Sequence, residues 1–323
     1  MGDPGCDASR NSVRILCDLQ PDFCELAMKI FLKALAALAL LALAVWAIRS
    51  DAERDVGNVS AEAFAAQAAA GPGADPSWRC NALWDDGKAE FCAYDVTWAH
   101  YGHRFAGRAL LILVKEPWAP DLNVKVDTPR RDGFDVLKLN HVRDVPTGIY
   151  TYHQMASVFT RRDSGALQKI AATSSEACGV STAEMIGGRL ETRSYFDGQG
   201  DRSMAYPAGA LPEDGLPASL RDYVAGRAPA TLQIFPSLLA GRFADLKPAV
   251  YRVEKREAAD GIEIRLTSGP SVLTYTFAKE APYLLLRFER EDGTVYRMAK
   301  CERIAYWEMH NPGDEAWLPP GVR

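Results

Sequence analysis

The stretch GIEIRLTSGPSVLTYTF, residues 261–277, decides the fold class because apolar and polar side chains alternate along it. Ile262, Ile264 and Leu266 are separated by Glu263 and Arg265, and the same period returns after a Ser-Gly-Pro turn. A period of two indicates strands with one buried face. Turn-forming residues bound similar stretches on either side, which predicts a meander of antiparallel strands over 250–257, 261–267, 272–277, 284–290 and 295–307.

The preceding part of the chain carries the same pattern less regularly. A single short helix is expected at 216–224, where Pro217 lies in the first turn and Gly226 follows the end. The sequence therefore predicts a mainly β domain, in which a curved antiparallel sheet forms an open barrel or a sandwich with one short helix. Its earlier strands are expected at 90–98, 107–114, 123–126, 134–140, 149–159, 167–174 and 190–196.

The N-terminal region has the features of an export signal. A run without polar residues over 34–45 follows Lys29 and Lys33. This pattern is typical of a signal peptide that begins at Met28 and is cleaved after Ala47; retention as an inner-membrane anchor is the alternative. The expected location is therefore the periplasm or the cell exterior. The predicted divisions are a non-native upstream extension (1–27), the signal or anchor (28–47), a flexible Ala/Gly/Pro linker (48–77) and a β-rich envelope domain (78–323).

Four of the seven cysteines lie in the expected domain: Cys80, Cys92, Cys178 and Cys301. An even number in an exported protein favours disulfides, and the lack of a Cys-x-x-Cys pair disfavours metal ligation. Three pairings are possible. The favoured one joins Cys80 to Cys92 across a Trp-Asp-Asp-Gly turn and Cys178 to Cys301 over a long loop.

Several spaced motifs support a family resemblance. They include Trp84-Asp85-Asp86-Gly87, Thr147-Gly148-Ile149-Tyr150-Thr151-Tyr152 and Ser174-Ser175-Glu176-Ala177-Cys178-Gly179. Over residues 84–197 the chain resembles an uncharacterised family of secreted or lipid-anchored bacterial envelope proteins, some of which carry a septum-formation-inhibitor label. True septum inhibitors are cytoplasmic nucleotide pyrophosphatases with a Ser-x-Arg phosphate loop, which this sequence does not match. The resemblance therefore implies an envelope protein of unknown function and no catalytic residues.

The second half resembles lipoprotein-carrier-like envelope domains in the pattern and order of its elements. The helix-bearing stretch at 216–221 and the hairpin from 281–284 to 303–307 carry this likeness. In such domains a strongly curved antiparallel sheet wraps an apolar groove that a helix partly plugs. The likeness implies a groove for an apolar or lipid-like ligand.

Candidate site residues are of two kinds. Aromatic side chains make good walls for an apolar groove, and residues two apart on a strand share one face. His100 and His103 are a possible metal pair; this spacing within a strand directs the two rings to opposite faces, whereas a loop or turn could bring them together. The candidates for lining the groove are Trp98, Trp118, Tyr150, Tyr152 and Gln154.

Composition and motifs exclude several function classes. The net charge is -5 and no basic stripe outweighs the acidic residues, which argues against a nucleic-acid partner. There is no phosphate loop, dinucleotide fingerprint or Gly-x-Ser-x-Gly elbow, so no cofactor is expected. Membrane contact is expected only through the N-terminal segment.

Two functional hypotheses follow. The favoured one is non-catalytic binding of an apolar or lipid-like ligand, or of a protein partner, within the curved sheet. The alternative is a periplasmic hydrolase or metal-dependent enzyme, which requires His100, His103 and an acid such as Asp95 or Glu116 to meet in one polar cleft.

Overall fold

The computed structural model describes residues 33, 34, 36, 37, 39, 74–243 and 245–319. The expected extension 1–27 lies outside these residues, as do most of the signal segment and of the linker. No helix in the described part of the chain is long and apolar enough to cross a membrane. The chain divides into two units, Met1–Asn58 and Val59–Arg323, and the described β fold belongs to the second.

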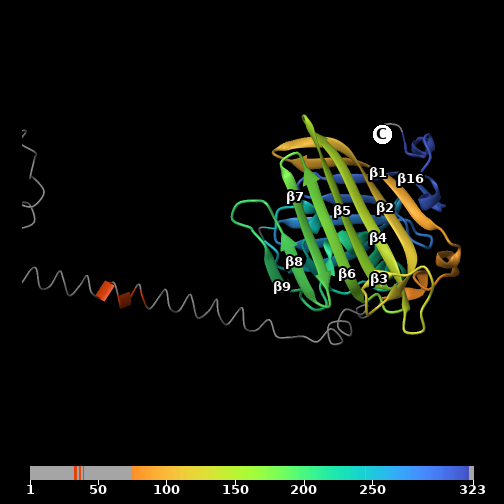
Figure 1. Cartoon of the computed structure of the whole chain (residues 1–323), viewed down its shortest axis with the longest axis horizontal. Helices are drawn as coiled ribbons and strands as arrows, with labels where there is room; N and C mark the ends of the chain where they lie inside the picture. The colour runs from red at the N-terminus through yellow and green to blue at the C-terminus, as the bar shows by residue number, and fades with distance from the viewer. Residues whose placement is uncertain (1–32, 35, 38, 40–73, 244, 320–323) are drawn as a thin grey trace, which may run out of the picture. The chain divides into compact units, whose positions relative to one another are not determined.

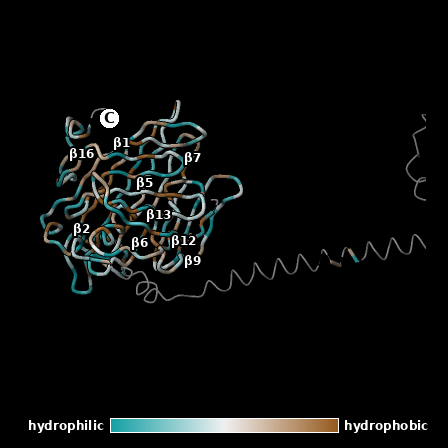
Figure 2. Tube along the Cα trace, turned by 180° about the vertical axis from the view of Figure 1, so that it is seen from behind, coloured by the Kyte–Doolittle hydropathy of each residue, from teal (hydrophilic) through white to brown (hydrophobic). Residues whose placement is uncertain are grey.

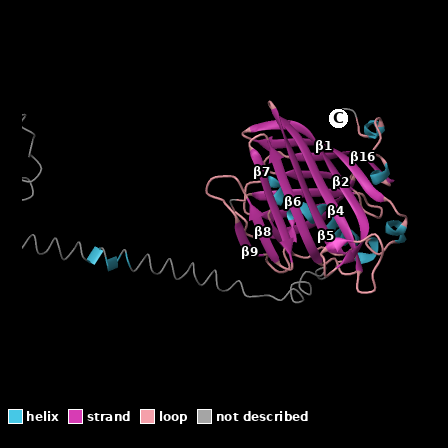
Figure 3. Ribbon diagram, viewed as in Figure 1, coloured by secondary structure: helices cyan, strands magenta, loops and turns pink. Residues whose placement is uncertain are grey.

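One sheet of sixteen strands makes up most of this unit and confirms the predicted mainly β class (Figures 1 and 3). The sheet curls without closing, and Figure 1 shows its later strands, in teal and blue, passing behind the earlier ones. The strands are β1 (Ala89–His100), β2 (His103–Ala119), β3 (Val124–Lys125), β4 (Phe134–Thr147), β5 (Tyr150–Arg161), β6 (Leu167–Glu176), β7 (Gly179–Ile186), β8 (Arg189–Arg193), β9 (Arg202–Ala205), β10 (Leu211–Pro212), β11 (Thr231–Phe235), β12 (Ala249–Ala258), β13 (Gly261–Ser268), β14 (Ser271–Phe277), β15 (Leu285–Arg290) and β16 (Val295–Ile304).

The strand order is β10-β11-β12-β13-β14-β15-β16-β1-β2-β4-β5-β6-β7-β8-β9, and β3 pairs with β2 outside this path. The predicted five-strand meander is present as β12 to β16. Every pair is antiparallel except β10 with β11. Alternation sets the two faces: Tyr152 and Gln154 of β5 are buried, whereas His153 and Met155 between them are exposed. Hydrophobic and hydrophilic residues are accordingly interleaved along the strands (Figure 2).

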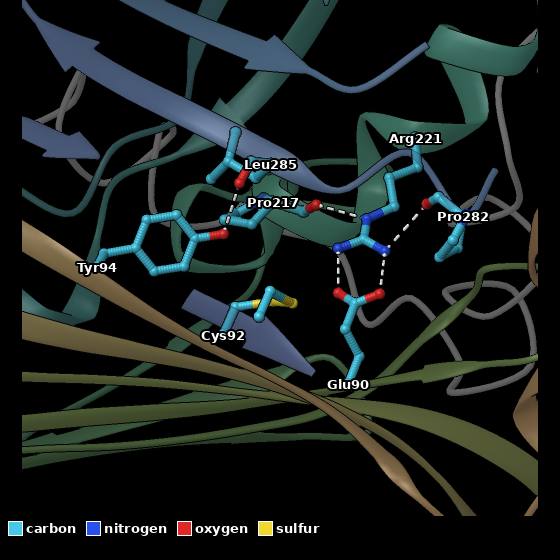
Figure 4. The surroundings of a disulfide bond; sticks show 8 residues. Glu90, Cys92, Tyr94, Pro217, Arg221, Pro282 and Leu285 are labelled. Atoms are coloured by element: carbon cyan, nitrogen blue, oxygen red, sulfur yellow. Dashed lines mark hydrogen bonds and ion pairs between the residues drawn. A yellow bond between two sulfur atoms is a disulfide. The ribbon is translucent and has the colours of Figure 1, made fainter. Parts of the chain in front are cut away.

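The first and the last strand in chain order, β1 and β16, are neighbours in the middle of the sheet. Cys92 of β1 lies directly opposite Cys301 of β16, and a disulfide links them (Figure 4). The predicted pairing of Cys80 with Cys92 and Cys178 with Cys301 is therefore wrong. Cys80 precedes β1 and Cys178 lies in the β6–β7 turn, and both are free and exposed. The register of β1 and β16 brings the Cα atoms of Cys92 and Cys301 to 4.0 Å, a pairing that sequence spacing does not reveal.

The remaining elements are short helical turns: η1 (Pro76–Trp78), η2 (Ala82–Asp85), η3 (Glu213–Gly215), α4 (Leu216–Ser219), α5 (Arg221–Ala225), η4 (Leu238–Ala240), η5 (Tyr306–Glu308) and η6 (Asp314–Trp317). The helix expected at 216–224 is present as two successive helices, α4 and α5. Pro217 lies in the first turn of α4 and Gly226 is the C-cap of α5. Both helices bury their apolar side chains inside the curled sheet.

The packed unit begins before the predicted boundary at residue 78. The Asp75 amide donates a hydrogen bond to the Asp222 carbonyl at 2.9 Å, and Ala74 packs against the core. The buried Trp78 ring donates to the Asp222 carboxylate at 2.6 Å. Residues 74–77 of the expected linker therefore belong to the folded unit.

Two apolar clusters fill the interior of the sheet. The larger one surrounds α4 and α5, including Leu216 and Tyr223. The other forms where Leu238 and Leu239 of η4 pack against the inner side chains of β5 to β8, such as Ile170. The helical turns therefore plug the curled sheet from within and leave space between the two clusters.

Candidate functional site

A cavity of about 420 Å³ lies inside the curled sheet. Its lining comes from the neighbouring strands β4, β1, β16, β15 and β14 of the curved sheet and from the turns η3 and η4, which we call the floor. Its aromatic lining comprises Trp98, Tyr275, Phe288 and Tyr296. Charged and polar groups reach the same space, so the cavity is amphipathic and not the dry apolar trough expected from the carrier-like pattern.

Arg143 of β4 is the central charged group of the cavity. Its side chain is buried, with 8% of the residue surface exposed. The guanidinium donates to Gln154 Oε1 at 2.8 and 2.5 Å and to the Tyr296 hydroxyl at 3.4 Å. It also lies 4.5 Å from the centroid of the Trp98 ring. Among the described residues, no carboxylate forms an ion pair with Arg143.

Gln154, which accepts the hydrogen bonds from Arg143, is itself held by β6 and by the turn η4. Gln154 Nε2 donates to Ser174 Oγ at 3.0 Å and to the Leu239 carbonyl at 2.5 Å. Gln154 lies opposite Arg143 on β4 and opposite Ser174 on β6, so strand register brings all three to the inner face. The amide orientation is thereby set, and its carbonyl oxygen faces the guanidinium.

His141 occupies the inner position two residues before Arg143. Its Nε2 lies 3.3 Å from the Tyr296 hydroxyl, and its buried Nδ1 has no hydrogen-bond partner in the described part of the chain. Burial, with a smaller effect of the neighbouring Arg143, lowers the pKa of His141 to about 3. The ring is therefore neutral at physiological pH and adds no charge beside Arg143.

The floor of the cavity carries the acidic groups. Asp214 accepts hydrogen bonds from Ser237 Oγ at 2.5 Å and from the Leu238 amide at 2.7 Å. Burial raises the pKa of Asp214 to about 6. Its neighbour Glu213 is ion-paired with Arg290 of β15. The Arg143 charge slightly offsets the rise in the pKa of Asp214, but neither carboxylate forms an ion pair with Arg143 in the described part of the chain.

Only Trp98 of the five predicted groove residues lines the cavity, and Tyr150, Tyr152 and Gln154 lie near it on the inner face of the sheet. Trp98 contacts Tyr152 edge-on with ring centroids 5.1 Å apart, and Tyr150 lies 5.7 Å from Tyr152 at the end of the same strand. With Gln154 they share the inner face, as the two-residue period predicts. Trp118 does not join them. It lies on the outer face of β2, where its ring packs 5.0 Å from Phe159.

The two predicted histidines do not form a metal site. A two-residue turn makes His100 and His103 directly opposed residues of the β1–β2 hairpin, so the expected separation onto opposite faces does not apply. His100 stacks on Trp98 with centroids 4.1 Å apart, and its buried Nε2 has no partner among the described residues. No group of three or more His, Cys, Asp or Glu side chains in that part of the chain is placed to hold a metal ion.

The acids named for an enzymatic cleft lie elsewhere. Asp95 alternates with the buried Tyr94 and Val96 and faces outward. Glu116 lies on the outer face of β2, where it accepts a hydrogen bond from Lys138 at 2.6 Å. Neither acid reaches His100, so the constellation required by the enzymatic hypothesis is not assembled.

The sequence pattern missed the residues that give the cavity its charge. Arg143 and His141 continue the inner row of Leu137 and Leu139, so two polar residues stand where the alternation calls for apolar ones. Polar residues at buried positions are informative because burying them is costly. This signal was available in the sequence. Tyr296 and Asp214 come from distant elements and required the tertiary structure.

No protein-family model and no curated protein matches the sequence. Among solved structures, the fold is similar to the crystal structure of a beta-barrel-like protein of the domain of unknown function DUF1849 from Brucella abortus. The two share 10% sequence identity and a TM-score of 0.39, over 68% of this chain and 98% of the other.

Proposed function

We propose that this protein binds, without catalysis, an amphipathic ligand that places an anionic group against Arg143 and its apolar part along the aromatic wall. The observation that carries the proposal is the buried Arg143 guanidinium, which faces a cavity of about 420 Å³ and has no ion-paired carboxylate among the described residues. Cavities of this size are typical of small-molecule sites.

The energetics of burial support an anionic ligand. An arginine removed from water without a counter-ion is costly, and hydrogen bonds to neutral oxygens offset only part of that cost. Gln154 and Tyr296 supply such oxygens, and the Trp98 face supplies a cation–π contact. A carboxylate or phosphate on the ligand would complete the set with a charge-assisted hydrogen bond.

The acidic side chains of the cavity do not occupy the position beside Arg143 that the anionic group of a ligand would take. Asp214 is held by η4 on the floor, and Glu213 is paired with Arg290. Asp245 and Asp292 lie at exposed positions of the lining. Arg143 thus presents a cation beside the Trp98 ring, which suits the acid group of a fatty acid or related amphiphile.

We also propose that the protein is exported and acts in the cell envelope. The Cys92–Cys301 disulfide supports this location because such bonds persist in oxidising compartments. The signal-like segment at 28–47 supports it independently. N-terminal sequencing of the protein from an envelope fraction tests the location and the cleavage after Ala47. Recovery of the full chain from the cytoplasm would contradict it.

Binding of 11-(dansylamino)undecanoic acid to the full chain tests the ligand proposal. We expect saturable binding that Arg143→Met weakens by about tenfold, since a charged hydrogen bond is lost. Arg297→Met, at an exposed position of β16, should leave the affinity unchanged. The methyl ester of the probe should bind the wild type and Arg143→Met equally.

A second variant guards against misfolding of Arg143→Met. Gln154→Glu supplies an internal carboxylate to Arg143 and should also weaken binding of the acid but not of the ester. Circular dichroism and thermal unfolding report whether each variant is folded. If folded Arg143→Met binds the acid as tightly as the wild type, the proposal is wrong. Native mass spectrometry of protein from an envelope fraction would then identify what the cavity holds.

A further inference from the structure

A small side pocket adjoins the cavity. Its volume is about 10 Å³, which is room for one water-sized group. His100, Ala240 and Arg242 line both the side pocket and the cavity, so the two spaces share a wall. The rest of the side pocket is lined by residues of β5, β6 and β7 and of the chain that follows β8. A molecule that occupies the cavity can therefore extend toward this pocket.

Two buried polar atoms on the wall of the side pocket lack hydrogen-bond partners. Ser181 of β7 is 1% exposed, and its Oγ has no partner in the described part of the chain. His100 Nε2 is buried as well and has no partner among the same residues. Native proteins pair nearly all their buried polar atoms, because an unpaired one is costly. Two such atoms around one pocket therefore indicate a polar group that binds between them.

The charges of the side pocket favour a neutral group. Glu176 supplies one negative charge and Arg242 one positive charge, so the lining selects neither an anion nor a cation. Burial, with smaller effects of Arg143 and Arg242, lowers the pKa of His100, and the imidazole is therefore neutral. A hydroxyl group can accept a hydrogen bond from Ser181, and it can donate to or accept from His100 Nε2 in either tautomer. A single hydroxyl thus matches the size, the charge and the unpaired atoms of the pocket.

A row of polar inner residues on four adjacent strands connects Arg143 with the side pocket (Figure 1). Arg143 of β4 lies opposite Gln154 of β5, which in turn lies opposite Ser174 of β6. Ser174 lies opposite Ser181 of β7. Neighbouring strands are about 4.8 Å apart, so the backbones at the two ends of this row are separated by about 14 Å. This distance is within the reach of one extended amphiphile.

The turn η4 determines which way such a molecule would pass. It covers the two middle residues of the row, because its backbone accepts the hydrogen bond from Gln154 and Gly241 at its end closely approaches Ser174. The direct path along the row is therefore closed. A ligand that extends from Arg143 would reach the side pocket past His100, which lines both spaces.

We propose that the ligand carries a hydroxyl group on its chain, which Ser181 and His100 bind in the side pocket while Arg143 binds the acid group. This inference rests on the proposed function and narrows the ligand class to hydroxylated fatty acids. A hydroxyl that enters a purely apolar cavity weakens binding, because it loses its hydrogen bonds to water. A hydroxyl in the side pocket strengthens binding, because it also pairs two buried atoms of the protein. The sign of the effect of one hydroxyl therefore tests the proposal.

The experiment is isothermal titration calorimetry of the full chain with fatty acids of eight to sixteen carbons and with the corresponding ω-hydroxy acids. The series places the hydroxyl at increasing distances from the acid group. We expect at least one hydroxy acid to bind about tenfold more tightly than its unsubstituted parent. Ser181→Ala should abolish this gain. Ser203→Ala, at an exposed serine of β9, is the matched control and should retain it.

Two further measurements keep the result independent of misfolding. The melting temperature of ligand-free Ser181→Ala should equal that of the wild type or exceed it, because the variant loses a hydroxyl that has no partner. His100→Phe keeps an aromatic ring stacked on Trp98 but removes Nε2. It should reduce the gain from the hydroxyl by about tenfold as well.

Three outcomes would overturn the proposal. The first is that no hydroxy acid of the series binds more tightly than its parent. The second is a gain that survives Ser181→Ala, which would place the hydroxyl elsewhere in the cavity. The third is a lower melting temperature of ligand-free Ser181→Ala without any gain in the wild type, which would identify the pocket as a site for a bound water only. Parent acids that bind equally to the wild type and to Arg143→Met would instead contradict the proposed function alone, since the gain is measured within each pair of acids.

Discussion

Glu90 and Arg221, which are 131 residues apart in the chain, form a bidentate ion pair inside the sheet with both side chains 4% exposed (Figure 4). The guanidinium donates to the Glu90 carboxylate at 2.6 and 3.1 Å, and also to the carbonyls of Pro217 and Pro282 at 3.1 and 3.0 Å. This pair ties α5 and the segment before β15 to the first strand, beside the disulfide.

Arg221→Met should destabilise the fold by about 3–5 kcal/mol, because it leaves the Glu90 carboxylate buried without a partner. Urea unfolding measures the effect. The double variant with Glu90→Gln should recover part of the loss. Arg303→Met is the matched control: its ion pair with Asp86 is partly exposed and should contribute at most about 1 kcal/mol. Additive losses in the double variant would show that the two side chains are not energetically coupled.

Replacing Cys92 and Cys301 by alanine should reduce the free energy of unfolding by on the order of 5 kcal/mol. The bond closes a loop over a sequence separation of 209 residues, and cross-links over long loops restrict the unfolded chain most strongly. Differential scanning calorimetry measures the loss. Cys80→Ser and Cys178→Ser, both at exposed free thiols, should change stability by less than about 0.5 kcal/mol. A comparable loss in these controls would contradict the assignment of the bridge.

Asp214 should make the wild type less stable as the pH rises. Burial raises its pKa from 3.8 to about 6, so the folded state holds this proton more tightly than the unfolded state. The stabilisation that protonated Asp214 gives the folded state is complete below pH 4 and is lost as the pH rises through 6. The loss in the free energy of unfolding is about 3 kcal/mol. His141, whose pKa is lowered to about 3, changes stability in the opposite direction over part of this range.

The measurement is therefore the difference between the wild type and Asp214→Asn, by urea unfolding at several pH values between 4 and 7.5. We expect the wild type to lose stability relative to the variant as the pH rises. A difference that does not vary with pH would show that Asp214 titrates in the folded state as it does in the unfolded chain.

Gly241→Ala should displace the plug and impair binding. Gly241 follows η4 with a φ of 67°, and an added Cβ would lie 2.6 Å from the Ser174 side chain. Ser174 in turn accepts a hydrogen bond from the Gln154 amide, and this bond orients the Gln154 carbonyl oxygen toward Arg143. We expect a loss of about 1–3 kcal/mol in thermal unfolding and weaker binding of the dansyl probe. Gly269→Ala, at an open turn with positive φ, should cost stability without affecting binding.

Local patterns predicted most strands because alternation is strong where inward residues are large. The alternation predicts β13 through Ile262, Ile264 and Leu266. It does not predict β7, because the inward positions of β7 include Ser181 and Ala183, which are too small to indicate a buried face. The very short β10 pairs in parallel with β11, and neither these strands nor β9 was anticipated. Long-range pairing was not predictable either, since nothing near Cys92 indicates that its partner follows 209 residues later.

The same distinction applies to the site. Tyr150, Tyr152 and Gln154 were grouped correctly because one strand determines their shared face. The sequence places Trp118 wrongly because its pattern predicts a strand that ends at residue 114, and only the full length of β2 shows which face the indole occupies. The surroundings of Arg143 are built by β1, β4, β5, β6, β16 and the turn η4. No short stretch of sequence contains all of these elements, so its role could not be predicted.

The pairing of β1 with β16 has a consequence for biosynthesis. The first strand of the domain acquires one of its two neighbours only when the last strand has left the ribosome or the translocation channel. Until then β1 presents an open edge, a template for pairing with other chains, and contacts between such distant segments form slowly. Removal of β16 should therefore expose an edge in the middle of the sheet, and the nascent chain should depend on chaperones until β16 emerges.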